Sequence, residues 1–290
     1  MITLSYYPGC SLNSSCDFYD ASLRKITDFY GIRLNELDGW SCCGASAALG
    51  VSEDLSVVLS GRNIALAENS GFPLVAPCSA CYARTKAAAR KITEDNETRR
   101  MVNEALSPVS LRGNIEVKNI IEMFLEYIGI ERIAGSVSHD LASIRAVAYY
   151  GCLLTRIMGI SPSDDVEDPT GMDRILNALG VTVIPWQYKT ECCGASTTIT
   201  NDLRTAELSG RIVKAAHRAG GQVIVTTCPL CQLNLDLTRY LGKDTAPLPV
   251  LFLPEIFELA LFGRISGGAR HIVNISPIED QVVPLEGKTR

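Results

Sequence analysis

The sequence predicts an α/β protein built from two pseudo-symmetric repeats with parallel strands. Two observations support this prediction: a doubled cysteine pattern, and an alternation of strand-like with helix-like segments. Each half carries a cysteine, then Cys-Cys-Gly, then Cys-x-x-Cys, and the last two motifs recur 150 residues apart. A duplication of this length repeats a whole domain rather than a solenoid unit. The ten repeated cysteines are Cys10, Cys42, Cys43, Cys78 and Cys81, and then Cys152, Cys192, Cys193, Cys228 and Cys231.

In the first half, three expected strands alternate with three expected helices. The strands are short runs rich in β-branched and aromatic residues. The helices carry apolar residues at helical spacing, and two of them end at a glycine. A cysteine motif follows each strand. Strands are expected over 2–7, 32–37 and 73–77, and helices over 17–31, 54–71 and 79–95.

The second half repeats this order. Its gap between the first cysteine and Cys-Cys-Gly is 39 residues, against 31 in the first half. We expect the eight additional residues in the polar stretch Ser161–Gly171, whose composition is typical of a loop. Strands are expected over 146–150, 181–186 and 222–227, and helices over 172–180, 203–220 and 229–242.

This alternation implies right-handed crossovers and a Rossmann-like parallel sheet in each half. The carboxyl ends of parallel strands meet at one edge of the sheet, where ligands bind. Because every repeated cysteine follows a strand, we expect five thiols to converge at one edge in each half. The glycine after each Cys-Cys pair would allow a tight turn against a bulky inorganic ligand.

Composition limits the possible classes of protein. The chain has 290 residues, with 47% hydrophobic and 20% charged residues, which suits one large or two ordinary domains. A net charge of −5 argues against a nucleic-acid surface. The N-terminus lacks the pattern of a signal peptide, and no apolar run reaches the ~18 residues of a membrane span. The most apolar tract, 247–263, is broken by a proline and two glutamates. We therefore expect a cytoplasmic, soluble protein.

The expected domains are 1–140, 141–266 and a C-terminal tail over 267–290. Each of the first two contains one set of five cysteines. The tail has little helical periodicity and is expected either to contact a partner or to be loosely ordered.

Clustered cysteines in a reducing compartment indicate metal binding or redox chemistry rather than structural disulfides. Zinc takes four ligands, so five thiolates in each half favour an iron–sulfur cluster, with zinc as the alternative. A thioredoxin-like dithiol at either Cys-x-x-Cys is less favoured, because the Cys-Cys-Gly pairs would then have no role. Cys16 has no counterpart and is expected to be a small buried residue.

The motifs YPGC, CCGAS and PCSAC, followed by YYGC, CCGAS and CPLC, resemble those of the CCG-domain proteins. More narrowly, they are similar to the B subunits of heterodisulfide reductase, over residues 1 to about 254. The resemblance implies two non-cubane [4Fe–4S] clusters, each held by one of the two sets of five cysteines. It also implies a catalytic subunit that reduces the mixed disulfide of coenzyme M and coenzyme B. The implied partners are a ferredoxin-like C subunit and a flavin-containing A subunit.

Reduction of a disulfide needs two electrons, and we hypothesise that the substrate lies between the halves and receives one electron from each cluster. An electron-relay subunit of another oxidoreductase and a zinc-stabilised structural subunit are the alternatives. Because both coenzymes are anionic, Arg84, Arg156 and Lys189 are candidate substrate-binding residues, against the alternative of solvated surface charges. The three histidines, His139, His217 and His271, are expected to be structural or at the surface.

Overall fold

The computed structural model describes residues 1–155, 164–237 and 246–287. The first half forms a four-stranded parallel sheet in the order β2-β1-β3-β4. Its strands are β1 (Ile2–Tyr6), β2 (Ile32–Glu36), β3 (Leu74–Val75) and β4 (Val117–Lys118). Its helices are α1 (Gly9–Leu12), α2 (Asp17–Phe29), α3 (Ala45–Val51), α4 (Glu53–Ser70), α5 (Ser79–Glu94), α6 (Asn96–Leu106), α7 (Ile120–Tyr127) and α8 (Ile130–Ser136).

The second half forms an equivalent parallel sheet in the order β7-β6-β8-β9. Its strands are β6 (Arg145–Tyr149), β7 (Thr182–Val183), β8 (Val223–Thr226) and β9 (Val250–Phe252). Its helices are α9 (Cys152–Thr155), α10 (Gly171–Ala178), the 3-10 turn η1 (Ala195–Thr197), α11 (Asp202–Ala219), α12 (Pro229–Asp236) and α14 (Leu253–Phe262). The two sheets confirm the α/β class with two repeats.

Each sheet has one strand more than the sequence predicted. β4 is only two residues long, which is too short for a recognisable pattern. β9 lies in the apolar tract 247–263, where no alternation of apolar and polar residues distinguishes the strand from the helix that follows it. β9 and most of α14 are completely buried, and burial on all sides removes the periodicity on which such predictions depend. The expected helix over 229–242 ends at Asp236 within the described residues, and its last five residues lie outside them.

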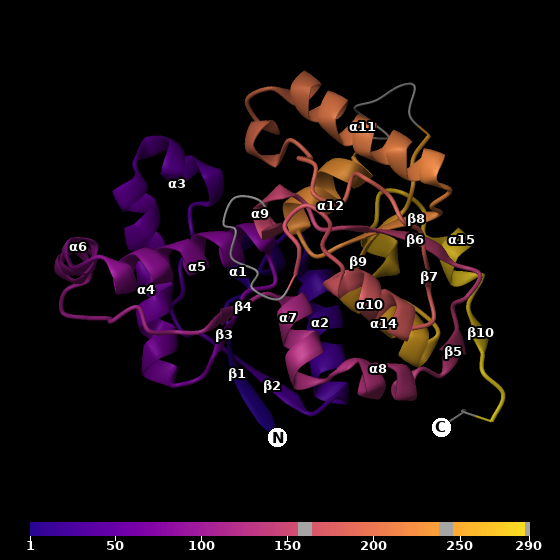
Figure 1. Ribbon diagram of the computed structural model, residues 1–290, viewed down its shortest axis with the longest axis horizontal. Coiled ribbons are helices and arrows are strands. Elements are labelled where there is room, and N and C mark those ends of the chain that lie inside the picture. The colour runs from indigo at the N-terminus through magenta and orange to yellow at the C-terminus, as the bar shows by residue number, and fades with distance from the viewer. Residues whose placement is uncertain (156–163, 238–245, 288–290) are drawn as a thin grey trace.

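The halves pack through reciprocal helix contacts. α2 packs against α14 of the second half, and α10 packs against α7 and α8 of the first. These helices lie together in the middle of the molecule, between the two sheets (Figure 1). Near the cysteines the exchange is repeated, because α5 contacts α9 and α12 contacts α1. Each first cysteine therefore lies close to the Cys-x-x-Cys helix of the other half.

The described part of the tail folds onto its own chain. It contains η2 (Gly268–Arg270), α15 (Ser276–Glu279) and β10 (Val283–Pro284), which pairs antiparallel with β5 (His139–Asp140). Ile275 and Ile278 are buried, and Asp236 accepts the backbone N–H groups of Ile272 and Val273 at 2.8 and 2.9 Å. A contact between the tail and a partner stays a prediction.

Candidate metal centre

The cysteines follow the carboxyl ends of three strands in each sheet. Cys10 comes four residues after β1 ends, Cys78 three residues after β3 and Cys228 two residues after β8. Each Cys-Cys pair lies in the loop after an outer strand, β2 or β7. The loops bring the thiols together as expected. Six of the ten cysteines are buried: Cys43, Cys78, Cys81, Cys193, Cys228 and Cys231. Cys152 is partly exposed, and Cys10, Cys42 and Cys192 are exposed.

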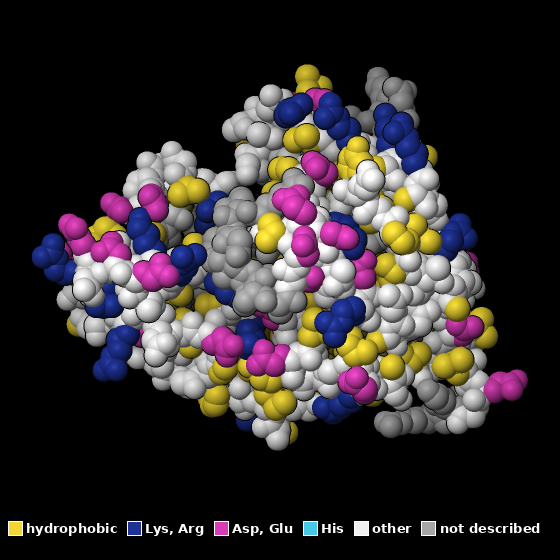
Figure 2. All heavy atoms as spheres, in the orientation of Figure 1, with side chains coloured by type: hydrophobic (Ala, Val, Ile, Leu, Met, Phe, Trp, Pro, Cys, Tyr) yellow, Lys and Arg dark blue, Asp and Glu magenta, His cyan; other side chains and the backbone are white. Residues whose placement is uncertain are grey.

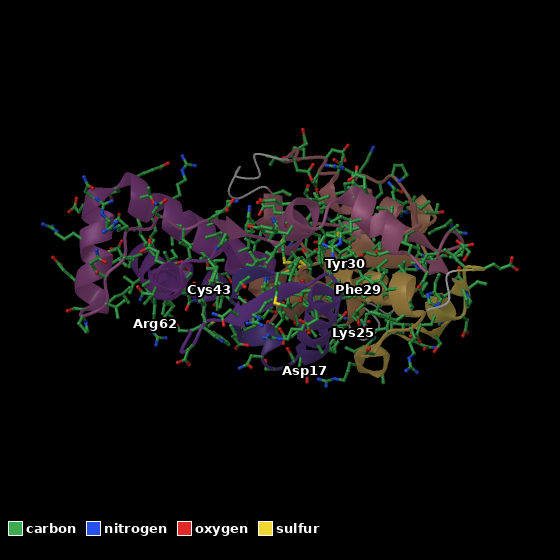
Figure 3. The ribbon with its side chains drawn as sticks, turned by 90° about the horizontal axis from the view of Figure 1, so that it is seen from below. Asp17, Lys25, Phe29, Tyr30, Cys43 and Arg62 are labelled. Carbon is green, nitrogen blue, oxygen red and sulfur yellow. The ribbon has the colours of Figure 1, made fainter. Side chains whose placement is uncertain are left out.

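The thiols contact one another in pairs within each half. In the first half, Sγ–Sγ distances are 3.8 Å between Cys42 and Cys10 and 3.6 Å between Cys43 and Cys81. In the second half, the distance from Cys193 to Cys231 is 3.4 Å. The Cys152 and Cys192 thiols also lie close enough to shift each other's pKa, upward for Cys152 and downward for Cys192. Sulfur atoms gather in the middle of the molecule, beside Cys43 (Figure 3).

The two sets of cysteines meet at one point. The Cys78 thiol of the first half and the Cys228 thiol of the second lie close enough to shift each other's pKa, upward for Cys78 and downward for Cys228. Tyr19, fully buried on α2, joins the same two loops. Its hydroxyl donates to the carbonyl oxygen of Thr227 at 3.0 Å and lies 3.4 Å from that of Pro77. These carbonyls immediately precede Cys228 and Cys78, so Tyr19 fixes the separation of the two Cys-x-x-Cys motifs.

Glycines allow the backbone to approach the sulfur atoms. Gly9 and Gly151, just before the first cysteine of each half, have φ of +73° and +71°. A Cβ at Gly9 would lie 2.7 Å from Cys81 Sγ, and one at Gly151 would lie 3.1 Å from Cys231 Sγ. A residue with a Cβ would therefore occupy the space where these sulfurs lie, in a conformation that only glycine adopts readily.

The glycine of each Cys-Cys-Gly motif has the same conformation, with φ of +75° at Gly44 and +82° at Gly194. This turn aims backbone N–H groups at the sulfur atoms. The N–H of Gly44 lies 3.4 Å from Cys42 Sγ, and the N–H of Gly194 lies 3.4 Å from Cys192 Sγ. Such bonds favour the thiolate form, which is the form that binds metal.

Sequence reasoning missed two tyrosines that hold the Cys-Cys loops. The Tyr7 hydroxyl donates to the Ser41 carbonyl oxygen at 2.8 Å, and the Tyr149 hydroxyl donates to that of Glu191 at 2.6 Å. Burial raises the pKa of both phenols, so they stay protonated as donors. The match between YPGC and YYGC contained this signal, because the tyrosine repeats together with the glycine and the cysteine.

Neighbouring thiols shift one another's pKa. Hydrogen bonds from the Cys42 and Cys81 thiols lower the pKa of Cys43 to about 3, against the effect of burial. In the second half, the hydrogen bond with Cys152 lowers the pKa of Cys192 to about 6. In each Cys-Cys pair, one sulfur therefore has a lowered pKa, which favours the thiolate form that binds metal.

Several buried hydroxyl groups near the cysteines lack a hydrogen-bond partner. Within the described residues, the side-chain oxygens of Ser41, Ser79, Thr155 and Thr227 are buried without one. Each is within three residues of a repeated cysteine. A buried hydroxyl without a partner costs free energy, and the sulfides of an iron–sulfur cluster accept hydrogen bonds. These donors fit such a cluster.

The donor set as a whole also fits an iron–sulfur group. In the part of the chain that the structure describes, no three His, Cys, Asp or Glu side chains are grouped as ligands of a single metal ion. Six of the thiols instead lie as three contacting pairs around the loops, with glycines and N–H groups beside them. Soft thiolates are the usual ligands of iron–sulfur clusters.

A model of the cysteine-rich CCG domain matches residues 4–86 and 146–236. The chain belongs to the CCG family. The two matched segments contain all ten repeated cysteines and leave out the tail. The structure of a hypothetical protein from Helicobacter pylori shares the fold, with a TM-score of 0.77 at 15% identity. That alignment covers 94% of this CCG protein and 52% of the other chain, so this chain spans about half of that structure.

Relatives of this CCG protein are subunits of oxidoreductases. It is 29% identical to the 8-methylmenaquinol:fumarate reductase membrane anchor subunit of Wolinella succinogenes, over 89% of this chain and 91% of the relative. A protein of Archaeoglobus profundus, named as similar to the B subunit of heterodisulfide reductase, is 27% identical, with 90% and 91% covered. The B subunit of a ferredoxin/F(420)H(2)-dependent CoB-CoM heterodisulfide reductase of Methanosarcina acetivorans is 25% identical, with 90% of each chain covered.

The candidate substrate-binding cations lie in different surroundings. In the first CCG domain, Arg84 Nε donates to the Ala45 carbonyl oxygen at 2.9 Å and so holds the Cys-Cys-Gly loop. Lys189 is almost completely buried and bound by carboxylates of its own chain. Arg156 lies outside the described residues. Contact of Arg84 and Lys189 with a substrate stays a prediction.

The remaining cysteine and the histidines lie beside the centre or away from it. Cys16 is buried at the start of α2, and burial raises the pKa of its thiol to about 11. The His271 side chain is fully buried, with Nε2 2.8 Å from Glu255 Oε1. His217 Nε2 lies 2.9 Å from a backbone carbonyl oxygen, and His139 Nδ1 lies 3.0 Å from Ser138 Oγ. No helix among the described residues has the length and apolar character needed to cross a membrane.

Charged side chains of both signs are spread over the face of the molecule seen in Figure 2, between scattered apolar groups.

Proposed function

We propose that this CCG protein is the disulfide-reducing subunit of a multisubunit oxidoreductase, with two non-cubane [4Fe–4S] clusters as its cofactors. Cys10, Cys42, Cys43, Cys78 and Cys81 would hold one cluster, and Cys152, Cys192, Cys193, Cys228 and Cys231 the other. The proposed substrate is the mixed disulfide of coenzyme M and coenzyme B, because several relatives with about 25% identity are named for that reaction.

The observation that carries this proposal is the bridge that Tyr19 makes between the carbonyl oxygens immediately before Cys78 and Cys228. It joins the two cysteine sets, so two one-electron centres would lie side by side. Cleavage of a disulfide consumes two electrons, and a pair of adjacent centres can supply them together. The exposed thiols of Cys10, Cys42 and Cys192 lie on the open side of each set, where a small substrate can reach the centre.

When bound, the clusters would supply single electrons and an iron site with affinity for thiolate sulfur. The protein's own groups hold the geometry: Tyr7 and Tyr149 fix the Cys-Cys loops, and Tyr19 fixes the spacing between the halves. These phenols are buried and already donate to carbonyl oxygens, so they are not the proton source. The two product thiols would take their protons from solvent at the exposed edge.

The electrons must come from partner subunits, and we propose a ferredoxin-like C subunit and a flavin-containing A subunit. We propose a cytoplasmic location, because thiols in such number stay available for metal in a reducing compartment.

A second function is favoured by the 29% identity to a fumarate reductase subunit. In that case the same two centres would pass electrons along a chain of cofactors without cleaving a disulfide. The two functions use the same ligands, so only the reaction itself separates them.

The first experiment tests the metal content of protein purified without oxygen. We expect about eight iron atoms and about eight sulfides per chain, four of each for every cluster. Replacement of Cys43 or Cys193 by serine should each remove about half of the iron, because each belongs to one set. Zinc in place of iron, or full iron retention in both variants, would contradict the cluster assignment.

The second experiment tests the reaction. Reduced viologen supplies electrons to the loaded protein, and thiols released from the mixed disulfide are counted with a chromogenic reagent. Release of two thiols per disulfide is the expected result. Intact clusters that are oxidised by an electron acceptor, yet release no thiol, would favour the relay function.

A further inference from the structure

We propose that Lys189 is a positioning residue that fixes Cys152 beside Cys192, and that its role is confined to the second cysteine set. This inference rests on the proposed function only in taking those cysteines as ligands. The contacts themselves are made by groups of the protein alone.

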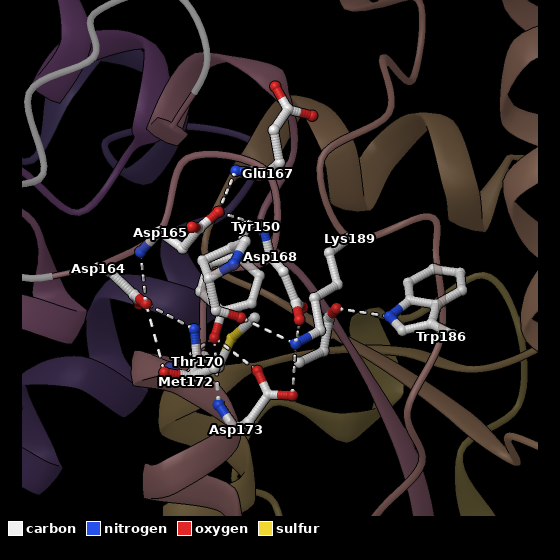
Figure 4. A network of polar contacts seen from close by, with 12 residues as sticks. Tyr150, Asp164, Asp165, Glu167, Asp168, Thr170, Met172, Asp173, Trp186 and Lys189 are labelled. Carbon is white, nitrogen blue, oxygen red and sulfur yellow. Dashed lines mark hydrogen bonds and ion pairs between the residues drawn. The ribbon is translucent and has the colours of Figure 1, made fainter.

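The Lys189 ammonium group is surrounded by acceptors from the segment before α10 and from its first turn. Its side chain is 8% exposed and lies 2.8 Å from Asp168 Oδ1 and 3.0 Å from Asp173 Oδ1. It also donates to the Pro169 carbonyl oxygen at 2.8 Å. Burial alone would lower the pKa of Lys189, but the two carboxylates outweigh burial and raise it, so the group stays charged. Figure 4 shows these contacts as one network.

The backbone of Lys189 completes the link to the cysteines. Its carbonyl oxygen accepts the N–H groups of Tyr150 and Gly151, at 2.8 and 3.0 Å. These two residues immediately precede Cys152, whereas Lys189 lies three residues before Cys192. One residue therefore ties together the loops that carry Cys152 and Cys192.

Tyr150 closes the network from the other side. Its hydroxyl donates to Asp173 Oδ2 at 2.6 Å and accepts the N–H of Met172 at 2.8 Å. Asp173 thus binds both the Lys189 ammonium and the hydroxyl of Tyr150, two residues before Cys152 (Figure 4). Charge-assisted hydrogen bonds of this kind are the stronger ones in a protein, and they hold their donors in one geometry.

The first half has no equivalent of this device. The position that matches Tyr150 is Pro8, which has no N–H to donate, and the position that matches Lys189 is Gly39. The acidic residues come from 164–173, next to and within the stretch where the second half is longer. Cys10 therefore serves as an internal control, because it occupies the same position in the first half as Cys152 does in the second and has no such network beside it.

The test uses the full chain, freed of metal by a chelator without oxygen, and measures alkylation of each cysteine by mass spectrometry. In Lys189→Met, we expect Cys152 to react about tenfold faster, the change that accompanies loss of a charge-assisted network. Cys10 should react at its original rate. In protein purified with its metal, the same variant should lose about half of the iron, which is the share of one set.

Two further variants keep the test decisive if Lys189→Met folds poorly. The Asp168 side chain is 77% exposed, so Asp168→Asn leaves the core intact. We expect it to raise the alkylation rate of Cys152 by about threefold, because a partly solvated ion pair contributes less than a buried one. Arg211→Met removes an exposed cation on α11 and should leave the alkylation rate of Cys152 unchanged.

An unchanged Cys152 rate in both Lys189→Met and Asp168→Asn would overturn the proposal. So would an equal rise at Cys10 in these variants, because that indicates general loosening of the chain. Absence of iron from the unaltered protein would instead count against the proposed function, and the alkylation rates would still report on the positioning role.

Discussion

Replacement of Gly9 by alanine tests whether the backbone before Cys10 must lie against the Cys81 sulfur. The new Cβ would lie 2.7 Å from Cys81 Sγ, well inside the ~3.5 Å at which heavy atoms attract one another. Gly9 also has φ of +73°, and this conformation costs about 1–2 kcal/mol for a residue with a Cβ. Both effects act on the loop that carries a proposed ligand.

The magnitude follows from adding a steric cost to the conformational one. Overpacking of a tight site costs about 1–3 kcal/mol, so Gly9→Ala should lower the free energy of unfolding by about 2–5 kcal/mol. Gly31 is the matched control, with φ of +74° and no atom within 4 Å of the place that a Cβ would take. Gly31→Ala should therefore cost only about 1–2 kcal/mol. Gly151→Ala, with its contact at 3.1 Å, should fall between the two.

The assay is urea unfolding of the metal-free chain for all three variants, followed by iron analysis of protein purified with its metal. We expect Gly9→Ala to lose iron from the first set and Gly31→Ala to retain all of it. Equal loss of stability in Gly9→Ala and Gly31→Ala, with equal iron content, would refute the claim that the cysteine sulfur requires a glycine here.

Three other predictions concern single side chains. Tyr19→Phe should lower the free energy of unfolding by about 1–3 kcal/mol, because a buried carbonyl oxygen loses its donor. Urea unfolding measures this change, and an unchanged free energy of unfolding would contradict the bridging role of Tyr19. Burial opposes the charged form of His271, but hydrogen bonding to Glu255 outweighs burial and raises the pKa of His271 above 6.5. Its stabilising contribution is therefore complete below pH 6.5 and is lost as pH rises through the raised value. His271→Gln should flatten this fall in stability on the alkaline side, and an identical pH profile in urea unfolding would contradict the assignment. Cys16→Ala should keep the full iron content while Cys43→Ser does not, because Cys16 is outside both sets; loss of iron from Cys16→Ala would make it a ligand.

Local patterns in the sequence were sufficient to predict three strands and three helices of each half, but not the shorter helices of the first half or helices α6 and α7. β-branched runs, helical spacing and glycine stops predicted the strands and helices on which the cysteines lie, and the structure places these elements within a few residues of the predicted ranges. The doubled motif also predicted that each set of thiols would converge. This follows because the carboxyl ends of parallel strands lie at the same edge of a sheet, independently of how that sheet packs against the rest of the molecule.

The relation between the halves was decided only by the tertiary structure. The hydroxyl of Tyr19 lies beside carbonyl oxygens of both Cys-x-x-Cys loops and so joins residues that are distant in the sequence. Such a contact between the halves depends on which helix faces pack together. The apolar faces of α2, α7, α10 and α14 do not by themselves determine which helix each one packs against. Sequence therefore determined what each half gathers, and the packing of helices between the halves determined that the two collections of sulfur lie side by side.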